Sequence, residues 1–284
     1  MQYLSPEVVQ QVIANPSLLK LGGERREITA YFSDVAGFTT ISEKLTPEEV
    51  VSLLNKYLTA MTDIILENGG TVDKYEGDAI VAFFGAPIPY ADHAIRCCNA
   101  AVDMQNALNS LRQKWMDEGY PAINVRMGIN TGPAIIGNMG SQQRMDYTMM
   151  GDTVNSASRF EGANKAYGTY TMISDSTYGY VKERFVTRKL DLLRVVGKTL
   201  PVTVYELVGR VGEVKDEKLE VIKKYHEALG LYNSRQWEKA GNLVKELVRA
   251  YGDVPSQTYY ERCVKFRKSP PPEDWDGVWV LKSK

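Results

Sequence analysis

The stretch VDKYEGDAIVAFFG, residues 72–85, sets a short polar break between two apolar runs. Lys74, Glu76 and Asp78 lie around Gly77, and the residues that follow are continuously apolar. Apolar runs that flank a glycine in a polar break predict a β-hairpin with the glycine in its turn. In such a hairpin, Lys74 and Asp78 either neutralise each other or serve separate sites. An exposed ion pair would add only about 0–1 kcal/mol to stability.

The composition predicts a folded chain without a strong net electrostatic field. Of 284 residues, 44% are hydrophobic and 24% charged, which is ample for one large domain with or without an appendage. The net charge of −1 gives no reason to expect nucleic acid as a partner. Cys97, Cys98 and Cys263 lack metal-ligand spacing and predict a reducing, cytoplasmic location. No apolar run approaches the ~18 residues of a membrane span. If the protein is the cytosolic part of a membrane-anchored receptor, we expect the anchor outside this chain.

Strands and helices follow one another irregularly along the sequence. EITAYFSDV (27–35) predicts a strand, and the capping box that begins at Thr46 predicts a helix. A longer helix is expected from about Tyr90 to Gly119, with His93 at its surface or capping its start. Further strand pairs are expected in INVRMGINTG with AIIGNMG, and in FVTRKLDLLRVV with PVTVYELVG. Hairpins without repeated strand-helix-strand units predict an α+β sandwich with a largely antiparallel sheet.

The C-terminal part has a different composition, which begins at GRVGEVKDEK (209–218). Two amphipathic helices are expected beyond it, at about 217–232 and 236–251, and they resemble a single tetratricopeptide-type unit. One such unit cannot bury its own apolar face, so we expect it to dock on the main domain or on a second chain. The last segment is expected to be an extended tail, with Trp275 and Trp279 lying on a surface.

Two carboxylates occupy predicted strand ends. Asp34 follows an apolar strand, where an ionised carboxylate costs several kcal/mol unless it is paired or bound to a metal. Behind it, Gly37 permits a tight turn whose backbone N–H groups can face an anion. Asp78 lies at the edge of the next predicted strand, so the two side chains could hold hard divalent ions such as Mg²⁺. The alternatives are that Asp34 caps the following helix and that Asp78 pairs with Lys74.

A third polar stretch, YTMMGDTVNSASR, leads into a predicted helix near Thr153. Asn155 and Arg159 are four residues apart and therefore share a helix face. Arginine suits phosphate oxygens, and asparagine can hydrogen-bond a sugar or phosphate oxygen. By spacing alone, an ordinary exposed helix surface explains both residues better. Asp152 is expected to cap the helix.

Together these stretches resemble the catalytic domain of class III nucleotidyl cyclases, from about residue 24 to 208. The likeness rests on motifs in family order and spacing: FSDVAGFT, VDKYEGDAIVAFFG, VRMGINTGPAIIGNMG, YTMMGDTVNSASR and VVGKTLPVTVYEL. It implies a ferredoxin-like, palm-type α/β sandwich that works as a homodimer with catalytic sites at the interface. It also divides the chain into a linker to an upstream sensor module (1–23), a catalytic domain (24–208) and a C-terminal helical extension with a tail (209–284).

The resemblance implies a metal and phosphate site. Asp34 and Asp78 would bind two Mg²⁺ or Mn²⁺ ions, with the Val35 carbonyl as an additional ligand. The triphosphate would contact the backbone of Ala36, Gly37, Phe38 and Thr39 and the side chain of Lys198.

The resemblance also implies how the nucleoside is held. Lys74 and Thr148 match the pair that recognises the base, while Asn155 and Arg159 match the residues that orient the ribose and stabilise the transition state. Lysine only donates hydrogen bonds, which suits adenine N1, and threonine can accept from the 6-amino group. Guanine reverses both groups and would leave them unpaired. We therefore expect an adenylate cyclase that converts ATP to 3′,5′-cyclic AMP and pyrophosphate, as the output domain of a signalling protein. The threonine at 148 resembles a bicarbonate-responsive subgroup, so bicarbonate regulation is also expected.

Other interpretations remain open on the sequence. A catalytically silent, cyclase-like module for dimerisation or nucleotide sensing would be expected to lack metal, base or transition-state residues, and here every matching side chain is present. A guanylate cyclase would carry an acid in place of Lys74. A diguanylate cyclase would carry a Gly-Gly-acid-Glu-Phe hairpin, where this chain has YEGDA. The products formed from ATP and GTP distinguish all of these.

Overall fold

The structure is a computed structural model, and it describes residues 9, 13, 21–141, 143–194 and 200–280. Most of the expected 1–23 linker and the predicted phosphate ligand Lys198 lie outside the described residues.

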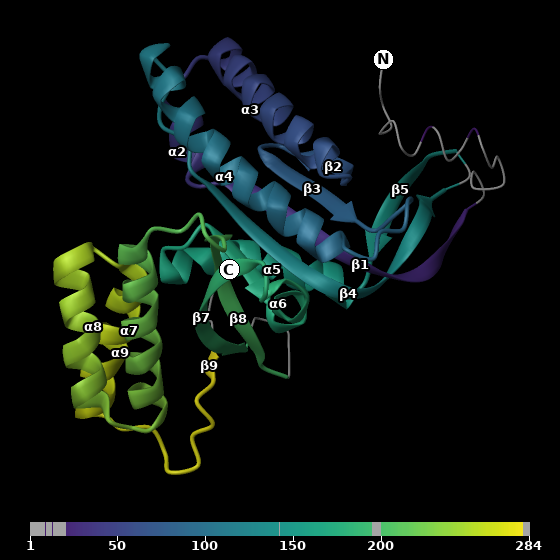
Figure 1. The fold of residues 1–284 in the computed structure, drawn as a ribbon. Helices are drawn as coiled ribbons and strands as arrows, with labels where there is room; N and C mark the ends of the chain where they lie inside the picture. Colours follow the sequence, from purple (N-terminus) through teal and green to yellow (C-terminus); the bar gives the residue numbers. More distant parts are fainter. Residues whose placement is uncertain (1–8, 10–12, 14–20, 142, 195–199, 281–284) are drawn as a thin grey trace.

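A nine-stranded sheet runs through the described part of the chain, in the order β2-β3-β1-β4-β6-β8-β7-β9, with β5 paired to β4 (Figure 1). The strands are β1 (Gly22–Val35), β2 (Thr71–Glu76), β3 (Ala79–Phe84), β4 (Val125–Gly140), β5 (Met145–Met150), β6 (Thr171–Ser174), β7 (Phe185–Arg194), β8 (Val202–Arg210) and β9 (Trp279–Val280). The pairs β4–β6 and β7–β9 are parallel, and the other neighbours are antiparallel. The predicted mixed fold with a largely antiparallel sheet is confirmed.

Helices cover both faces of this sheet (Figure 1). They are α2 (Phe38–Ser42), α3 (Pro47–Glu67), α4 (His93–Asp117), α5 (Asp152–Tyr167), α6 (Asp175–Val181), α7 (Asp216–Asn233), α8 (Trp237–Tyr251) and α9 (Val254–Lys268). Helices α3, α4 and α6 share one apolar core with the sheet, while α5 and the C-terminal helices form a second core on the other side. Among the described residues, no helix combines the length and apolar character that a membrane crossing requires.

The opening stretch forms the hairpin β2–β3, and β3 is central to the fold because it lies between β2 and β1. Its side chains alternate between the two faces of the sheet. Ile80 and Phe84 join the α3/α4 side, whereas Val81 and Phe83 join the opposite side. A strand buried on both faces has no polar positions, which explains the continuous apolar run in the sequence.

The second predicted hairpin is wrong, because INVRMGINTG and AIIGNMG belong to the single 16-residue strand β4. Gly132 and Pro133 lie where the two segments meet, and Gly-Pro is a dipeptide typical of turns. In the structure Pro133 pairs with Glu27 of the long strand β1, and its carbonyl accepts a hydrogen bond from Thr153 Oγ1 at 2.7 Å. The true partner of this end of β4 is β5.

His93 is also not at the surface. It begins α4 but is only 6% exposed, and its Nδ1 lies 2.8 Å from Thr29 Oγ1. Asp152 is the first residue of α5 and not its cap, since Gly151 occupies the N-cap position. Both differences concern where a helix end meets the sheet.

The C-terminal extension contains three helices, where two were expected. The third, α9, begins after Asp253, whose side chain accepts a hydrogen bond from the Ser256 amide. Its inward face buries the polar residues Ser256 and Arg262, so its apolar periodicity is weak and the sequence did not reveal it. The expected docking on the main domain is confirmed, because these helices share an apolar core with α5, β7 and β8.

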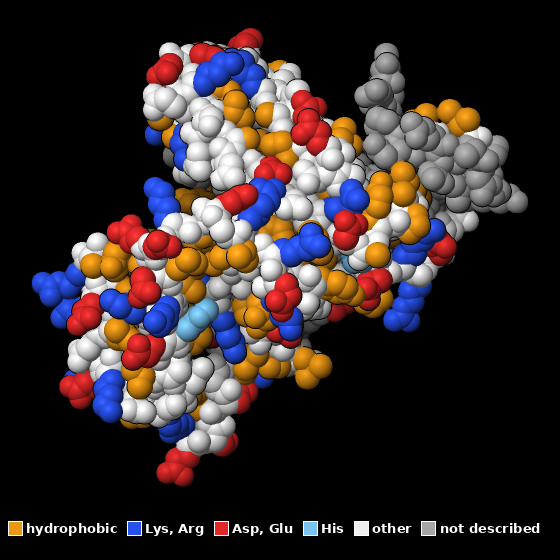
Figure 2. Space-filling model, viewed as in Figure 1, with side chains coloured by type: hydrophobic (Ala, Val, Ile, Leu, Met, Phe, Trp, Pro, Cys, Tyr) orange, Lys and Arg blue, Asp and Glu red, His pale blue; other side chains and the backbone are white. Residues whose placement is uncertain are grey.

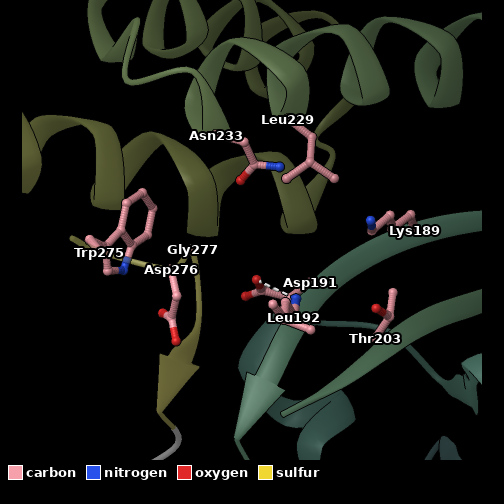
Figure 3. Close-up of a pocket in the computed structure, with 9 residues that line it drawn as sticks. All are labelled: Lys189, Asp191, Leu192, Thr203, Leu229, Asn233, Trp275, Asp276 and Gly277. Carbon is pink, nitrogen blue, oxygen red and sulfur yellow. Dashed lines mark hydrogen bonds between the residues drawn. The ribbon is translucent and has the colours of Figure 1, made fainter. Parts of the chain in front are cut away.

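The C-terminal tail lies along the contact between these helices and the sheet. Trp275 and Trp279 pack against the C-terminal core, and β9 adds to the edge strand β7. A cavity of about 380 Å³ remains between α7, the tail and β7. Figure 3 shows Leu229 and Asn233 of α7 on one side of it and Asp191 of β7 on the other. None of the predicted site residues that the structure describes lines this cavity.

Candidate active site

Two of the predicted metal ligands lie side by side. Asp34 is near the end of β1, and Asp78 is in the β2–β3 turn, where its Oδ2 accepts a hydrogen bond from the Val35 amide at 3.0 Å. Burial, followed by the neighbouring Asp34 carboxylate, raises the pKa of Asp78 to about 6. Adjacent carboxylates attract a cation, because it removes the repulsion between them.

Two further residues belong to this cluster. Arg126 of β4 lies opposite Asp34 in the strand register, and its guanidinium is 4.0 Å from the Asp34 carboxylate. The same guanidinium donates to Glu161 of α5 at 3.3 Å. Burial, then Asp34, raises the pKa of Glu161 to about 7 although Arg126 opposes this. The sequence analysis missed both residues, since only the register of β1 with β4 reveals that they meet Asp34.

The donor set at this cluster fits a hard divalent cation. Within the described ranges, no group of three or more His, Cys, Asp or Glu side chains is arranged as a metal cage. Mg²⁺ is usually held by one or two carboxylates and completed by substrate phosphates, and Asp34 and Asp78 provide such a pair. Asp34 does not cap the following helix, because Gly37 is the N-cap of α2 and no side chain caps it.

The backbone after Asp34 turns sharply into α2. Gly37 has φ 72°, a left-handed conformation that a side chain disfavours. The Ala36 amide donates to the Asn124 carbonyl at 2.7 Å. The amides of Gly37, Phe38 and Thr39 donate to no backbone carbonyl among the described residues, so they remain available to an anion.

Lys74 and Thr148 come from different strands but meet at one side chain, Asp73. Lys74 Nζ lies 3.6 Å from Asp73 Oδ1, and the Thr148 hydroxyl donates to Asp73 Oδ2 at 2.5 Å. Within the described part of the chain, Lys74 forms its ion pair with Asp73 and not with Asp78. The simple salt bridge across the hairpin turn is therefore absent, and Asp73 is a residue that the sequence analysis missed.

Asn155 and Arg159 lie on α5, which follows β5 directly. Asn155 is exposed and Arg159 half-buried, and neither side chain has a hydrogen-bond or ion-pair partner among the described residues. Helix α5 approaches β4 very closely at Gly128, where a Cβ atom would lie 2.1 Å from the Ala157 carbonyl oxygen. Only glycine fits there, so this residue sets the position of α5 against the sheet.

Apart from Asn155 and Arg159 on α5, the predicted residues that the structure describes form two groups. Asp34, Asp78 and the turn into α2 make one, and Lys74 with Thr148 makes the other. Among the described residues, no hydrogen bond or ion pair joins the two groups. The first offers carboxylates and free amides, which suit metal and phosphate. The second offers a cation beside a hydroxyl, which suits a polar ring edge.

Known proteins resemble this chain in sequence and in fold. Residues 23–209 match the family described as "Adenylate and Guanylate cyclase catalytic domain". The chain is 37% identical over 215 residues to "Adenylate cyclase 1" of Rhizobium meliloti (strain 1021), covering 75% of this chain and 32% of that protein. It is 32% identical to the terminal-differentiation-specific adenylate cyclase of Dictyostelium discoideum, covering 93% of this chain and 12% of that protein. The chain thus spans a third or less of the length of these relatives.

Solved structures are similar as well. The adenylyl cyclase CyaB from P. aeruginosa has a TM-score of 0.63 and 37% identity, over 69% of this chain and 100% of that one. The guanylyl cyclase Cya2 has a TM-score of 0.62 and 36% identity, over 69% of this chain and 98% of that one. The match over residues 23–209, with these relatives, shows that the chain belongs to the family of adenylate and guanylate cyclase catalytic domains.

Proposed function

We propose that this protein is an adenylate cyclase that converts ATP to 3′,5′-cyclic AMP and pyrophosphate, as the output domain of a signalling protein. The observation that carries the proposal is the meeting of Lys74 and Thr148 at Asp73. It sets a group that only donates hydrogen bonds beside a hydroxyl oxygen that can accept them. Adenine presents the complementary pair, N1 as acceptor and the 6-amino group as donor.

Asp34, Asp78 and the Val35 carbonyl would hold two Mg²⁺ or Mn²⁺ ions. Such ions lower the pKa of the ribose 3′-hydroxyl and offset charge on the phosphates. The hydrogen bond from the Val35 amide fixes the Asp78 carboxylate beside Asp34, so the chain itself positions the ligands before substrate arrives.

The remaining residues act on the phosphates and the ribose. The free amides of Gly37, Phe38 and Thr39 would hold phosphate oxygens, with Lys198 as a further cation for the triphosphate. Asn155 would hydrogen-bond the ribose. Arg159 would offset the charge that builds on the α-phosphoryl oxygens as the 3′-oxygen attacks in line. Because that contact strengthens in the transition state, loss of Arg159 would lower kcat more than it raises KM.

The active form would be a homodimer in which each site combines the two residue groups from different protomers. Ile135 and Met150 lie opposite each other on the β4–β5 hairpin and are 39% and 54% exposed. Figure 2 shows hydrophobic side chains gathered over this hairpin. Paired apolar side chains exposed beside a site favour a protein partner, and a second copy would bring its own Lys74 and Thr148.

The test of the proposed reaction is product analysis. The purified chain is incubated with ATP or with GTP in Mg²⁺ or Mn²⁺, and the products are separated by chromatography. We expect cyclic AMP from ATP and little cyclic GMP from GTP. Preference for GTP would make the protein a guanylate cyclase. No cyclic product from either nucleotide would identify a silent module.

The shared site has its own test. A Lys74→Ala chain and an Asp78→Ala chain are each expected to be inactive alone. Mixed, they form heterodimers in which one site keeps an intact Lys74 and an intact Asp78, so part of the activity returns. If both residues served the same protomer's site, the mixture would remain inactive. Dilution of the wild-type chain is expected to lower its specific activity as the dimer dissociates.

We also propose regulation by bicarbonate, which rests on the residue at position 148. Thr148 resembles the residue of bicarbonate-responsive relatives, so we expect bicarbonate to raise the activity at saturating ATP and constant pH. A flat response would remove this part of the proposal. An upstream sensor module and a cytoplasmic location remain expectations from the sequence.

A further inference from the structure

The residue that joins Lys74 and Thr148 has no role in the reaction proposed above. Asp73 lies in the middle of β2, at a position where the register with β3 shifts: Val72 pairs with Ala82, and Lys74 pairs with Val81. Asp73 is therefore the extra residue of a β-bulge. Neighbouring residues of a regular strand point to opposite faces, whereas a bulge redirects one of them. Here it brings the Asp73 carboxylate within 3.6 Å of the Lys74 ammonium.

The Asp73 side chain is buried at a cost. It is only 2% exposed, and burial raises its pKa although the Thr148 hydroxyl and Lys74 oppose this. Its Oδ1 has no hydrogen-bond partner among the described residues. A carboxylate buried without full pairing is energetically unfavourable, so its presence indicates that a specific arrangement depends on it. That arrangement includes its hydrogen bond to Thr148.

This hydrogen bond determines what Thr148 can offer a ligand. A threonine hydroxyl has a single hydrogen and two lone pairs, so it can either donate or accept toward a base. A carboxylate can only accept. While Asp73 Oδ2 takes the Thr148 hydrogen at 2.5 Å, the Thr148 oxygen has only lone pairs left for a base.

We propose that Asp73 is the positioning residue that sets the purine specificity of this site, by holding the Thr148 hydroxyl as an acceptor and the Lys74 ammonium beside it. This inference rests on the proposed cyclase function and extends it. Adenine fits the resulting donor–acceptor pair. A 6-oxopurine presents N1–H to Lys74 and a carbonyl to the Thr148 oxygen, so it meets a donor with a donor and an acceptor with an acceptor.

The test compares kcat/KM for ATP with kcat/KM for inosine triphosphate, in wild-type protein and in Asp73→Asn. Inosine carries the N1–H and 6-carbonyl of guanine without the 2-amino group, so it isolates the ring edge that Thr148 and Lys74 face. An asparagine amide has the same shape but can rotate to donate to Thr148, which frees the hydroxyl hydrogen for a 6-carbonyl. We expect the preference for ATP to fall about 10- to 100-fold, mainly through KM, as for one misdirected buried hydrogen bond.

Two matched variants separate positioning from general damage. Asp146→Asn removes a carboxylate that lies near Asp73 and belongs to the same strand, β5, as Thr148, and it should leave the ATP preference unchanged. In a Thr148→Val background the hydroxyl is gone, so Asp73→Asn should change the preference no further. An additive effect there, or an equal loss for both nucleotides with an unchanged ratio, would overturn the inference.

Different results would overturn the cyclase function and the role of Asp73. Wild-type protein that forms no cyclic nucleotide from ATP would overturn the cyclase function, and the role of Asp73 with it. Wild-type protein that is active on ATP, with the same nucleotide preference in Asp73→Asn, would overturn the role of Asp73 alone.

Discussion

Carboxylates occur in two parts of this molecule with opposite surroundings. At the end of β1, Asp34 and Asp78 lie beside each other, and Asp78 has a raised pKa from burial and from Asp34. Beneath the C-terminal helices, each buried carboxylate meets an arginine. Arg262 pairs with Asp191, and Arg188 Nη1 lies 2.7 Å from Asp253.

The difference separates a structural from a functional use of the same residue types. Burial alone would raise the pKa of Asp253, but Arg188 and Ser256 outweigh it, so the pKa is lowered. Those carboxylates are satisfied by the chain and hold α9 against β7. The Asp34–Asp78 pair is incompletely neutralised, because Arg126 is 4.0 Å from Asp34 and closer to Glu161. Carboxylates that the fold leaves unmatched are the ones available to a metal and its substrate.

The largest effect is expected at the unmatched pair. Asp78→Asn keeps the shape of the side chain but removes a metal ligand, so kcat should fall at least about 10⁴-fold, or roughly 5 kcal/mol. Cyclic AMP formation in excess Mg²⁺ measures it, and a melting curve without metal serves as the folding control. Activity within tenfold of wild type would remove Asp78 from the metal site.

The matched region should respond in stability and not in catalysis. Arg262→Met leaves Asp191 buried without its arginine, which should lower the free energy of unfolding by about 3–5 kcal/mol. Arg267→Met, on the exposed side of the same helix, is the control and should change it by about 0.5 kcal/mol or less. Urea denaturation measures both. Equal effects of the two variants would contradict a structural role for the buried pair.

A smaller change in the same network tests its hydrogen bonds. The Tyr167 hydroxyl donates to Asp191 at 2.5 Å, and Arg262 donates to that hydroxyl at 3.0 Å. Tyr167→Phe should lower stability by about 1.5–3 kcal/mol, the range for a hydrogen bond to a charged group. Nucleotide turnover per folded molecule should not change. A loss of turnover without a loss of stability would link this network to the active site.

The smallest predicted effect is a change in melting temperature, measured in EDTA at several pH values. Its sign should differ between Asp78→Asn and Asp253→Asn. The raised pKa of Asp78 means that the folded protein binds more protons than the unfolded chain between about pH 4 and 6, so wild-type stability falls there as pH rises. Asp78→Asn removes this penalty, and it should raise the melting temperature at pH 7 but not at pH 3.

Asp253→Asn should do the opposite. The lowered pKa of Asp253 contributes stability above its ordinary value of 3.8, and this contribution is lost as pH falls through the lowered pKa. The variant should therefore melt at a lower temperature than wild type at pH 7 and approach it in acid. The same sign for both variants would contradict the contrast between the two regions.

Much of the architecture could be predicted from periodicity. The run after Gly77 indicated a buried strand, and the capping box at Thr46 indicated α3, where the reciprocal side-chain hydrogen bonds are present. The β4 prediction failed because pairing with β1 keeps Pro133 extended. Local turn propensity carries no information about pairing with a distant strand. Helix α9 was missed because its buried face mixes apolar residues with Ser256 and Arg262, and the partners of those polar residues are found only in three dimensions.

The candidate site divides in the same way. Residue type and position at predicted strand ends marked Asp34 and Asp78, and the resemblance to class III cyclases marked Lys74 and Thr148 as the pair that recognises the base. Asp73 could not be recognised, because its role depends on a β-bulge that no local sequence pattern indicates.

For the hairpin VDKYEGDAIVAFFG, the sequence by itself determined two strands, a glycine turn and the presence of the charged groups. Only the tertiary structure decided how those charges are used. The β1–β3 pairing brings Asp78 to the Val35 amide at 3.0 Å, and the bulge turns Lys74 toward Asp73. The physical reason is that electrostatic interactions act over a few ångströms in space, whatever the separation along the chain.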